Sequence, residues 1–226
     1  MTTAKTASTP APAWPVTIGL LVLTAVPSLA GIARLVSLAS GGPVSAENAR
    51  FFAAPLPAII HIISVLLYCI VGAFQFAPVR RYNITWHRLT GRVLVVAGII
   101  SALSGLWMNQ FYAIPAELQG PLLYTVRILV GLGMLASIIL AWLRILKKDV
   151  ASHRAWMIRA YALGQGAGTQ VLTMLPPAIL LGGDITGFPR DVLMSLAWVI
   201  NLLVAEWIIR RPQFRQNKKP QQVTAS

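Results

Sequence analysis

The sequence has few of the residues that catalytic and metal sites most often use. Its 226 residues include only six Asp and Glu, three His and one Cys. The single cysteine, Cys69, excludes intrachain disulfides, cysteine zinc sites and iron–sulfur clusters held by this chain alone. There is no Ser-His-Asp set, no HExxH motif and no cluster of carboxylates, so hydrolase chemistry has no support.

Charged residues of either sign are also scarce. They make up 11% of the chain, against about 25% in soluble domains. Apolar residues make up 56%, and the mean hydropathy is +0.69. This composition excludes an ordinary cytosolic fold and a disordered protein. The net charge of +13 does not indicate nucleic-acid binding, because no basic soluble domain carries it.

Six apolar segments are long enough to cross the hydrocarbon core of a bilayer, which takes about 20 helical residues. They are residues 16–38, 56–77, 93–111, 122–146, 155–181 and 192–209. The sequence therefore predicts an all-α integral membrane protein with six transmembrane helices, of which the second to fifth form a central four-helix bundle. The predicted domain organisation is a disordered leader (1–13), a six-span domain (14–211) and a basic cytoplasmic tail (212–226).

Lysine and arginine gather on one side of these spans. The second and fourth connections and the tail are basic, whereas the other three connections hold only Arg50 and Arg190 as cations. Because cytoplasmic loops collect Lys and Arg, both termini are predicted to be cytoplasmic. One alternative concerns the first span, where residues 28–30 resemble a signal-peptidase site. Cleavage there would leave five spans and an outside N-terminus.

Two of the three histidines occur in similar contexts. His87 and His153 each precede a span that runs from inside to outside, so they are predicted at equal depth on the inner side. Two imidazoles on neighbouring helices are suitable axial ligands for the iron of haem b. Four nearby arginines would neutralise the haem propionates: Arg88, Arg92, Arg154 and Arg159. Six glycines would open a slot for the porphyrin: Gly91, Gly98, Gly105, Gly164, Gly166 and Gly168.

The same residues also have a structural explanation. Small residues are typical of closely packed membrane helices, and His-Arg pairs are common interfacial cations. Arg159 can pair with Glu206, since both are predicted near the inner side. The glycine-rich run 164–168 is predicted to lie inside the fifth span, which excludes a phosphate-binding loop. Gln165 within that run is expected to form hydrogen bonds between helices.

Three further polar residues lie near the outer ends of the spans: Arg34, His61 and Arg127. His61 is 26 residues from His87, and Arg127 is 26 residues from His153, so the four central spans form two similar helix pairs. Arginine has no free lone pair and cannot ligate iron, so Arg127 stands where a second outer ligand would be expected. The three residues can instead form an outer site for an anion or a quinone, and the arginines can also be interfacial anchors.

The stretch from His61 to about Arg159 resembles a family of bacterial membrane proteins grouped as domain of unknown function 2306. The matching features are His61 with Gly72 and Gln75, the segment 87–92 and the segment 153–161. The resemblance implies an architecture and no activity, and with the charge bias it predicts a multi-pass protein of the bacterial cytoplasmic (inner) membrane. The architecture is also similar to that of six-helix diheme cytochromes, with Arg127 in place of a fourth histidine.

The leading functional prediction is a b-type haem protein in membrane electron transfer. The chain would then be a membrane oxidoreductase, with a quinone or another membrane redox protein as its partner within the lipid bilayer. A first alternative is a permease for a small molecule or anion, with Arg34, His61 and Arg127 as its site. Against it, neither an inverted repeat nor a broken helix pair at the midplane is recognisable. A second alternative is a non-catalytic assembly or accessory subunit in an oligomer or larger complex.

Overall fold

The computed structural model describes residues 14–77 and 83–211. Within these ranges the protein is helical and contains no strand, which confirms the all-α prediction. The elements are α1 (Trp14–Ser40), α2 (Ala49–Ala53), α3 (Pro55–Leu66), the π-helical η1 (Leu67–Val71), the 3-10 helix η2 (Phe74–Phe76), α4 (Ile84–Phe111), α5 (Pro121–Leu146), α6 (Val150–Gly164), α7 (Gly166–Leu181) and α8 (Gly187–Arg210). The predicted leader, the basic tail from residue 212 and Arg80 and Arg81 of the second connection lie outside the described residues.

Five helical segments are long and apolar enough to cross a membrane. They are α1, the continuous unit α3–η1–η2 (Pro55–Phe76), α4, α5 and α8. Large apolar side chains cover their outer faces; Val22, Leu29 and Leu203 are each about two-thirds exposed. A helix satisfies its own backbone hydrogen bonds, so such faces can contact lipid without cost to the backbone.

The fifth predicted span is not a single helix, so the prediction of one continuous helix over 155–181 is wrong. α6 ends at Gly164 and α7 begins at Gly166, with Gln165 between them. The glycine-rich run 164–168 therefore lies at a helix break. The apolar pattern does not reveal the break, because glycine is common in unbroken membrane helices as well.

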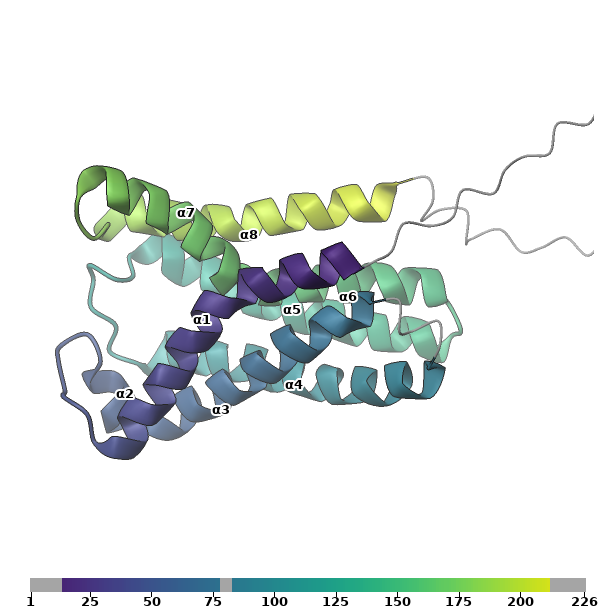
Figure 1. Cartoon of the computed structure of the whole chain (residues 1–226), viewed down its shortest axis with the longest axis horizontal. Helices are drawn as coiled ribbons and strands as arrows, with labels where there is room; N and C mark the ends of the chain where they lie inside the picture. The colour runs from purple at the N-terminus through teal and green to yellow at the C-terminus, as the bar shows by residue number, and fades with distance from the viewer. Residues whose placement is uncertain (1–13, 78–82, 212–226) are drawn as a thin grey trace, which may run out of the picture.

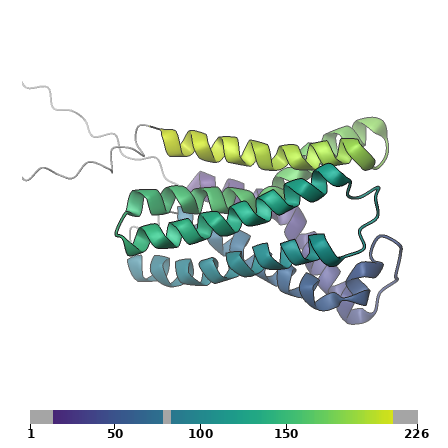
Figure 2. The ribbon, with the colours of Figure 1, turned by 180° about the vertical axis from the view of Figure 1, so that it is seen from behind.

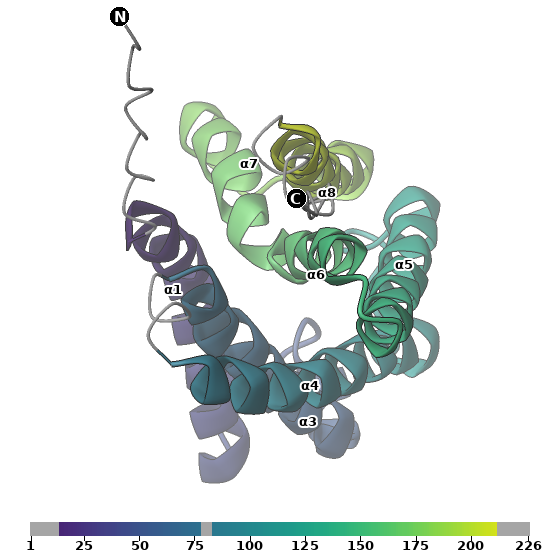
Figure 3. The same ribbon diagram turned by 90° about the vertical axis from the view of Figure 1, so that its right-hand side faces the viewer.

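The long helices run side by side, and both ends of the described chain lie at one end of the molecule (Figures 1 and 2). We call this the terminal end, and it also carries the connection between α5 and α6. The opposite end, which we call the loop end, carries α2, the connection between α4 and α5, and the turn between α7 and α8 (Figure 1). In the view of Figure 3, α6 lies between α5 and the α7–α8 pair. The most extensively packed pairs are α5–α6, α3–α4, α4–α5 and α7–α8.

The buried core lies where α3–η1, α4, α5 and α6 meet. Tyr68 of η1 is 2% exposed and fits between Gly98 of α4 and Gly164 of α6. A Cβ at Gly98 or Gly164 would lie 2.8 or 2.7 Å from the Tyr68 ring. Tyr161 packs against Gly72 in the same way. These glycines let the helices approach closely around two large aromatic side chains.

α4 begins before the apolar span that the sequence predicts over 93–111, and α6 begins before residue 155. Asn83 and Asp149 cap the two helices: each side-chain oxygen accepts a hydrogen bond from the backbone N–H three residues later, at 2.8 and 3.0 Å. His87 and His153 each lie four residues after their cap. Both histidines therefore lie in the first turn of a helix, whereas the prediction placed them before the spans, in the connections.

Candidate functional site

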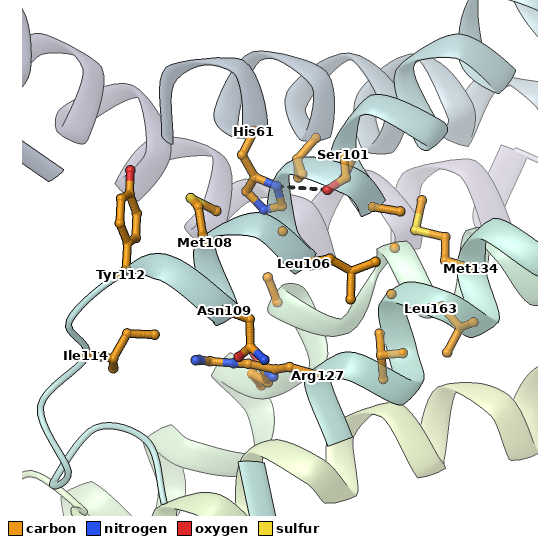
Figure 4. Close-up of a pocket in the computed structure, with 18 of the residues that line it drawn as sticks. His61, Ser101, Leu106, Met108, Asn109, Tyr112, Ile114, Arg127, Met134 and Leu163 are labelled. Carbon is orange, nitrogen blue, oxygen red and sulfur yellow. Dashed lines mark hydrogen bonds between the residues drawn. The ribbon is translucent and has the colours of Figure 1, made fainter. Parts of the chain in front are cut away.

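A cavity of about 350 Å³ lies within the bundle toward the loop end (Figure 4). Its volume falls in the range of small-molecule sites, about 300–1,000 Å³. Its polar lining side chains are Arg50, His61, Asn109, Arg127, Gln170 and Arg190. Its apolar lining side chains include Val65, Leu106, Val130, Met134 and Leu163. Arg127 and Asn109 lie on one side of the cavity, and Met134 and Leu163 lie on the other (Figure 4), so we call these sides the cationic part and the apolar part.

Three arginines reach this cavity from three different elements, α2, α5 and α8. Arg127 donates a hydrogen bond to Oε1 of Gln119, and Arg190 Nε donates to the Leu118 carbonyl at 3.2 Å. Nη1 of Arg50 is buried and makes no hydrogen bond with any described residue. None of the described Asp or Glu side chains forms an ion pair with Arg50, Arg127 or Arg190. Glu47 and Asp191 act on Arg50 and Arg127 only at longer range, so the three arginines are not paired directly with a carboxylate among the described residues.

The surroundings of Arg50 add to this positive charge. Its guanidinium lies 4.5 Å from the centroid of the Phe51 ring, and that of Arg34 lies 4.8 Å from the same centroid. Burial, together with the positive charge of Arg34, lowers the pKa of Arg50 from its ordinary value. Arg34, which the sequence predicts in the outer site, therefore acts on Arg50 and is not among the residues that line the cavity.

His61 lines the same cavity as Arg127. Its Nδ1 lies 3.0 Å from the Ser101 carbonyl oxygen (Figure 4). The same nitrogen lies 3.0 Å from Ser104 Oγ. Gly105 leaves room for the ring, since a Cβ there would lie 3.2 Å from Cε1. The structure thus brings together two of the three residues that the sequence predicts for an outer site. The sequence analysis did not include Arg50 and Arg190 in this site, because both fall in predicted connections, where a cation is ordinary.

Asp191 of α8 supports the start of α5, from which Arg127 projects. Its carboxylate is 1% exposed and accepts hydrogen bonds from the N–H groups of Gly120 at 3.0 Å and Leu123 at 3.2 Å. A carboxylate is favourable at the N-terminus of a helix, where N–H groups have no partner within the helix. These partners lie 71 and 68 positions apart in the chain. No local sequence pattern therefore reveals the contact.

The helix break lies beside the cavity, since Gly164 lines it. The last carbonyl groups of α6 have no partner in a continuing helix, and side chains of α8 supply donors instead. Trp198 Nε1 donates to the Leu163 carbonyl at 3.1 Å, and Asn201 Nδ2 donates to the Ala162 carbonyl at 3.0 Å. Non-helical backbone at membrane depth is stable only when protein or enclosed water satisfies it. The helix break is therefore stabilised by specific hydrogen bonds from α8.

Gln165, which is 4% exposed, fills the gap between α6 and α7. Its Oε1 accepts a hydrogen bond from Thr24 Oγ1 of α1 at 3.0 Å, and its Nε2 donates to the Tyr161 hydroxyl at 2.7 Å. That hydroxyl donates in turn to the Cys69 carbonyl at 2.7 Å. These contacts confirm that Gln165 forms hydrogen bonds between helices, and they connect the break to α1 and η1.

The residues predicted to hold haem lie toward the terminal end, and none of them lines the cavity. His153 Nδ1 lies 2.9 Å from the Ala141 carbonyl oxygen of α5. Arg159 forms an ion pair with Glu206 at 2.5 Å, as the structural alternative expects. Within the described part of the chain, no group of three or more His, Cys, Asp and Glu side chains is placed to hold a metal ion. The other three arginines predicted for the propionates are exposed: Arg88, Arg92 and Arg154.

The glycines expected to form a porphyrin slot mostly face protein side chains. Gly98 and Gly164 face Tyr68, Gly105 faces His61, Gly166 faces Trp198, and Gly168 faces the backbone and side chain of Leu23. Only Gly91 of the predicted set has no such neighbour within 4 Å. A porphyrin at these positions would have to displace core side chains, so these glycines do not form an open slot.

A comparison with known protein families identifies the family of this chain. A family model described as "Predicted membrane protein (DUF2306)" matches residues 58–209, which extend from α3 into α8 and include His61, Arg127 and the helix break. No curated protein and no solved structure matches the chain. The matched segment covers well over half of the sequence, and its membrane character agrees with the five long apolar helices. The chain therefore belongs to the DUF2306 family of membrane proteins.

Proposed function

We propose that this membrane protein binds an anionic amphiphile in the cavity, with the head group at the arginines and the apolar chain along the apolar part. The observation that carries the proposal is the convergence of Arg50, Arg127 and Arg190 on one cavity without a direct ion pair to any described carboxylate. A charge held away from water is costly unless it is paired. An anion is the partner that such a site fits best.

The shape of the site supports a ligand with a head and a tail. Arg127, Val130 and Met134 follow one another along the face of α5 that lines the cavity. Met134 lies seven positions after Arg127, which is about 10.5 Å along the helix axis at 1.5 Å per residue. The lining thus changes from cationic to apolar over roughly the length of a short alkyl chain.

The helix break supports a permease over a fixed binding protein. Transporters commonly bind substrate beside discontinuous helices, whose free backbone groups and two halves can rearrange. Gly164 and Ala167, on either side of the break, both line the cavity. The sequence argument against a permease relied in part on the absence of broken helices, and the break between α6 and α7 supplies one.

The binding proposal is tested with decanoate and decanol as probes. Purified protein in lipid nanodiscs is titrated calorimetrically with each, with empty nanodiscs as the blank. We expect decanoate to bind tighter, and Arg127→Met to weaken it by about 10- to 150-fold, since a hydrogen bond to a charged group contributes about 1.5–3 kcal/mol. Arg34→Met is the matched control, because it removes the same charge at the same end but outside the cavity. Equal effects of the two substitutions would refute the cavity as the site.

Transport is measured separately with decanesulfonate, which stays charged and so does not cross lipid as a neutral acid. Proteoliposomes are expected to accumulate it faster than empty liposomes, and those with Arg127→Met to match empty ones. Binding without accumulation would refute the permease and leave the binding proposal standing. Binding of neither probe, with co-purification of a larger complex, would favour the accessory-subunit alternative.

We also infer that α6 and α7 together form a sixth span, with the loop end outside and both termini in the cytoplasm. The two helices contain 15 and 16 residues, enough together for a kinked crossing. The described loop cations lie mainly toward the terminal end, as cytoplasmic loops require. In a Cys69→Ser background, an impermeant maleimide should label Asp184→Cys on intact bacterial cells and spare Lys148→Cys. The reverse pattern would invert the orientation.

Electron transfer through haem b is a second candidate, favoured by one observation. The His153 Nδ1 contact with the Ala141 carbonyl orients the ring and leaves Nε2 for another partner, which is the usual arrangement of a ligating imidazole. Haem ligation requires a Soret band that sharpens with dithionite and is lost in His87→Ala and His153→Ala. A colourless protein after expression with added haem would refute it.

A further inference from the structure

The cavity also contains hydrogen-bond acceptors that a simple anion does not use. The arginines supply donors, which suit the oxygens of a carboxylate or phosphate. His61 and Asn109 line the same cavity and present acceptors. The inference below rests on the proposed function and concerns the chemistry of its ligand.

The hydrogen-bond partners of His61 determine which of its nitrogens carries the proton. The Ser101 carbonyl oxygen, 3.0 Å from Nδ1, can only accept. Ser104 Oγ, also 3.0 Å away, uses its own hydrogen toward the Ile100 carbonyl at 2.6 Å. Nδ1 therefore donates, and the neutral ring keeps the lone pair of Nε2. Figure 4 shows this second nitrogen on the side of the ring away from Ser101.

Asn109 presents a second acceptor. Its Nδ2 donates to the Tyr124 carbonyl at 3.2 Å, which fixes the orientation of the side-chain amide. Its Oδ1 is buried and accepts no hydrogen bond from any described residue, although the residue is only 6% exposed. Buried polar atoms in native proteins are nearly always paired. An unpaired acceptor in the wall of a cavity indicates a donor on the ligand.

We infer that the ligand carries a hydroxyl group close to its anionic group, with the anion at the arginines and the hydroxyl donating to Asn109 or His61. A hydroxylated carboxylate amphiphile and a water-soluble hydroxylated anion share this chemistry. The apolar part of the cavity favours the amphiphile.

The test compares 3-hydroxydecanoate with decanoate by calorimetry on the full chain in nanodiscs. We expect the hydroxylated probe to bind at least about 10-fold tighter, since a site built to pair a hydroxyl discriminates against ligands that lack it. Asn109→Leu should reduce this ratio toward one, because it removes the acceptor that pairs the hydroxyl. Gln110→Leu is the matched control: it removes the side-chain oxygen that accepts a hydrogen bond from the Tyr124 hydroxyl, and it lies outside the cavity lining.

The outcomes separate the two proposals. Equal affinity of the unsubstituted protein for the two probes would overturn the hydroxyl inference. This comparison does not depend on the folding of any variant. If decanoate binding still depends on Arg127 in that case, the proposed function stands. Loss of the Arg127 dependence would overturn the proposed function itself. A parallel comparison of glycerol 3-phosphate with inorganic phosphate distinguishes an amphiphilic ligand from a water-soluble one. If the hydroxylated anion is preferred in this pair but not in the decanoate pair, the ligand is a water-soluble anion and not an amphiphile.

Discussion

Asn201 of α8 is the most direct test of the helix break, because one side chain serves both of its halves. Its Nδ2 donates to the Ala162 carbonyl of α6 at 3.0 Å, and its Oδ1 accepts from Thr169 Oγ1 of α7 at 2.7 Å. Asn201→Leu keeps the size of the side chain and removes both hydrogen bonds. Each is worth about 0.5–1.5 kcal/mol, so we expect the free energy of unfolding to fall by about 1–3 kcal/mol. In a chain of this length that lowers the melting temperature by roughly 2–12 °C.

The protein carries its own probe for this measurement. Cys69 is the single cysteine, is 3% exposed and has its Sγ 3.5 Å from the Gly164 carbonyl oxygen, beside the break. Labelling by a fluorogenic maleimide during a temperature ramp therefore reports opening of this region. Ser195→Ala is the control on the same helix, since Ser195 Oγ is buried without a hydrogen-bond partner in the described structure and its removal should not lower the melting temperature. If the Asn201→Leu and Ser195→Ala variants have the same melting temperature, the reasoning about the helix break is wrong.

Two further predictions concern packing and helix capping. Gly98→Ala should lower the free energy of unfolding by about 1–3 kcal/mol relative to Gly91→Ala, because both gain the same helix propensity but only the Cβ at residue 98 would lie 2.8 Å from Tyr68; equal stabilities in denaturant titrations would contradict this packing. Asp191→Ala should cost about 1–3 kcal/mol and accelerate amide hydrogen exchange at the start of α5, because it removes an acceptor from two backbone N–H groups. The exposed Asp184→Ala should leave that exchange unchanged, and an equal acceleration in both would contradict the capping role.

The candidate site was only partly predictable from the sequence. His61 and Arg127 stand out because ionisable residues are rare inside apolar spans, and the structure places both in one cavity. Arg50 and Arg190 carry no such signal, since a cation in a connection is ordinary. They belong to the site because α2 and the start of α8 fold back over the loop end, and no local pattern encodes that contact. The orphaned Oδ1 of Asn109 likewise becomes visible only once its neighbours are known.

The sequence by itself determined the all-helical membrane class, the family and the approximate positions of five long helices. A membrane helix forms its backbone hydrogen bonds within a few residues, so apolar length is sufficient evidence. Only the tertiary structure decided that the fifth segment is broken at Gln165, because the donors that stabilise its free carbonyl groups come from α8, 35 and 39 positions away. The same reason explains the cationic cavity: its charges are distant in the chain, and packing alone sets them side by side.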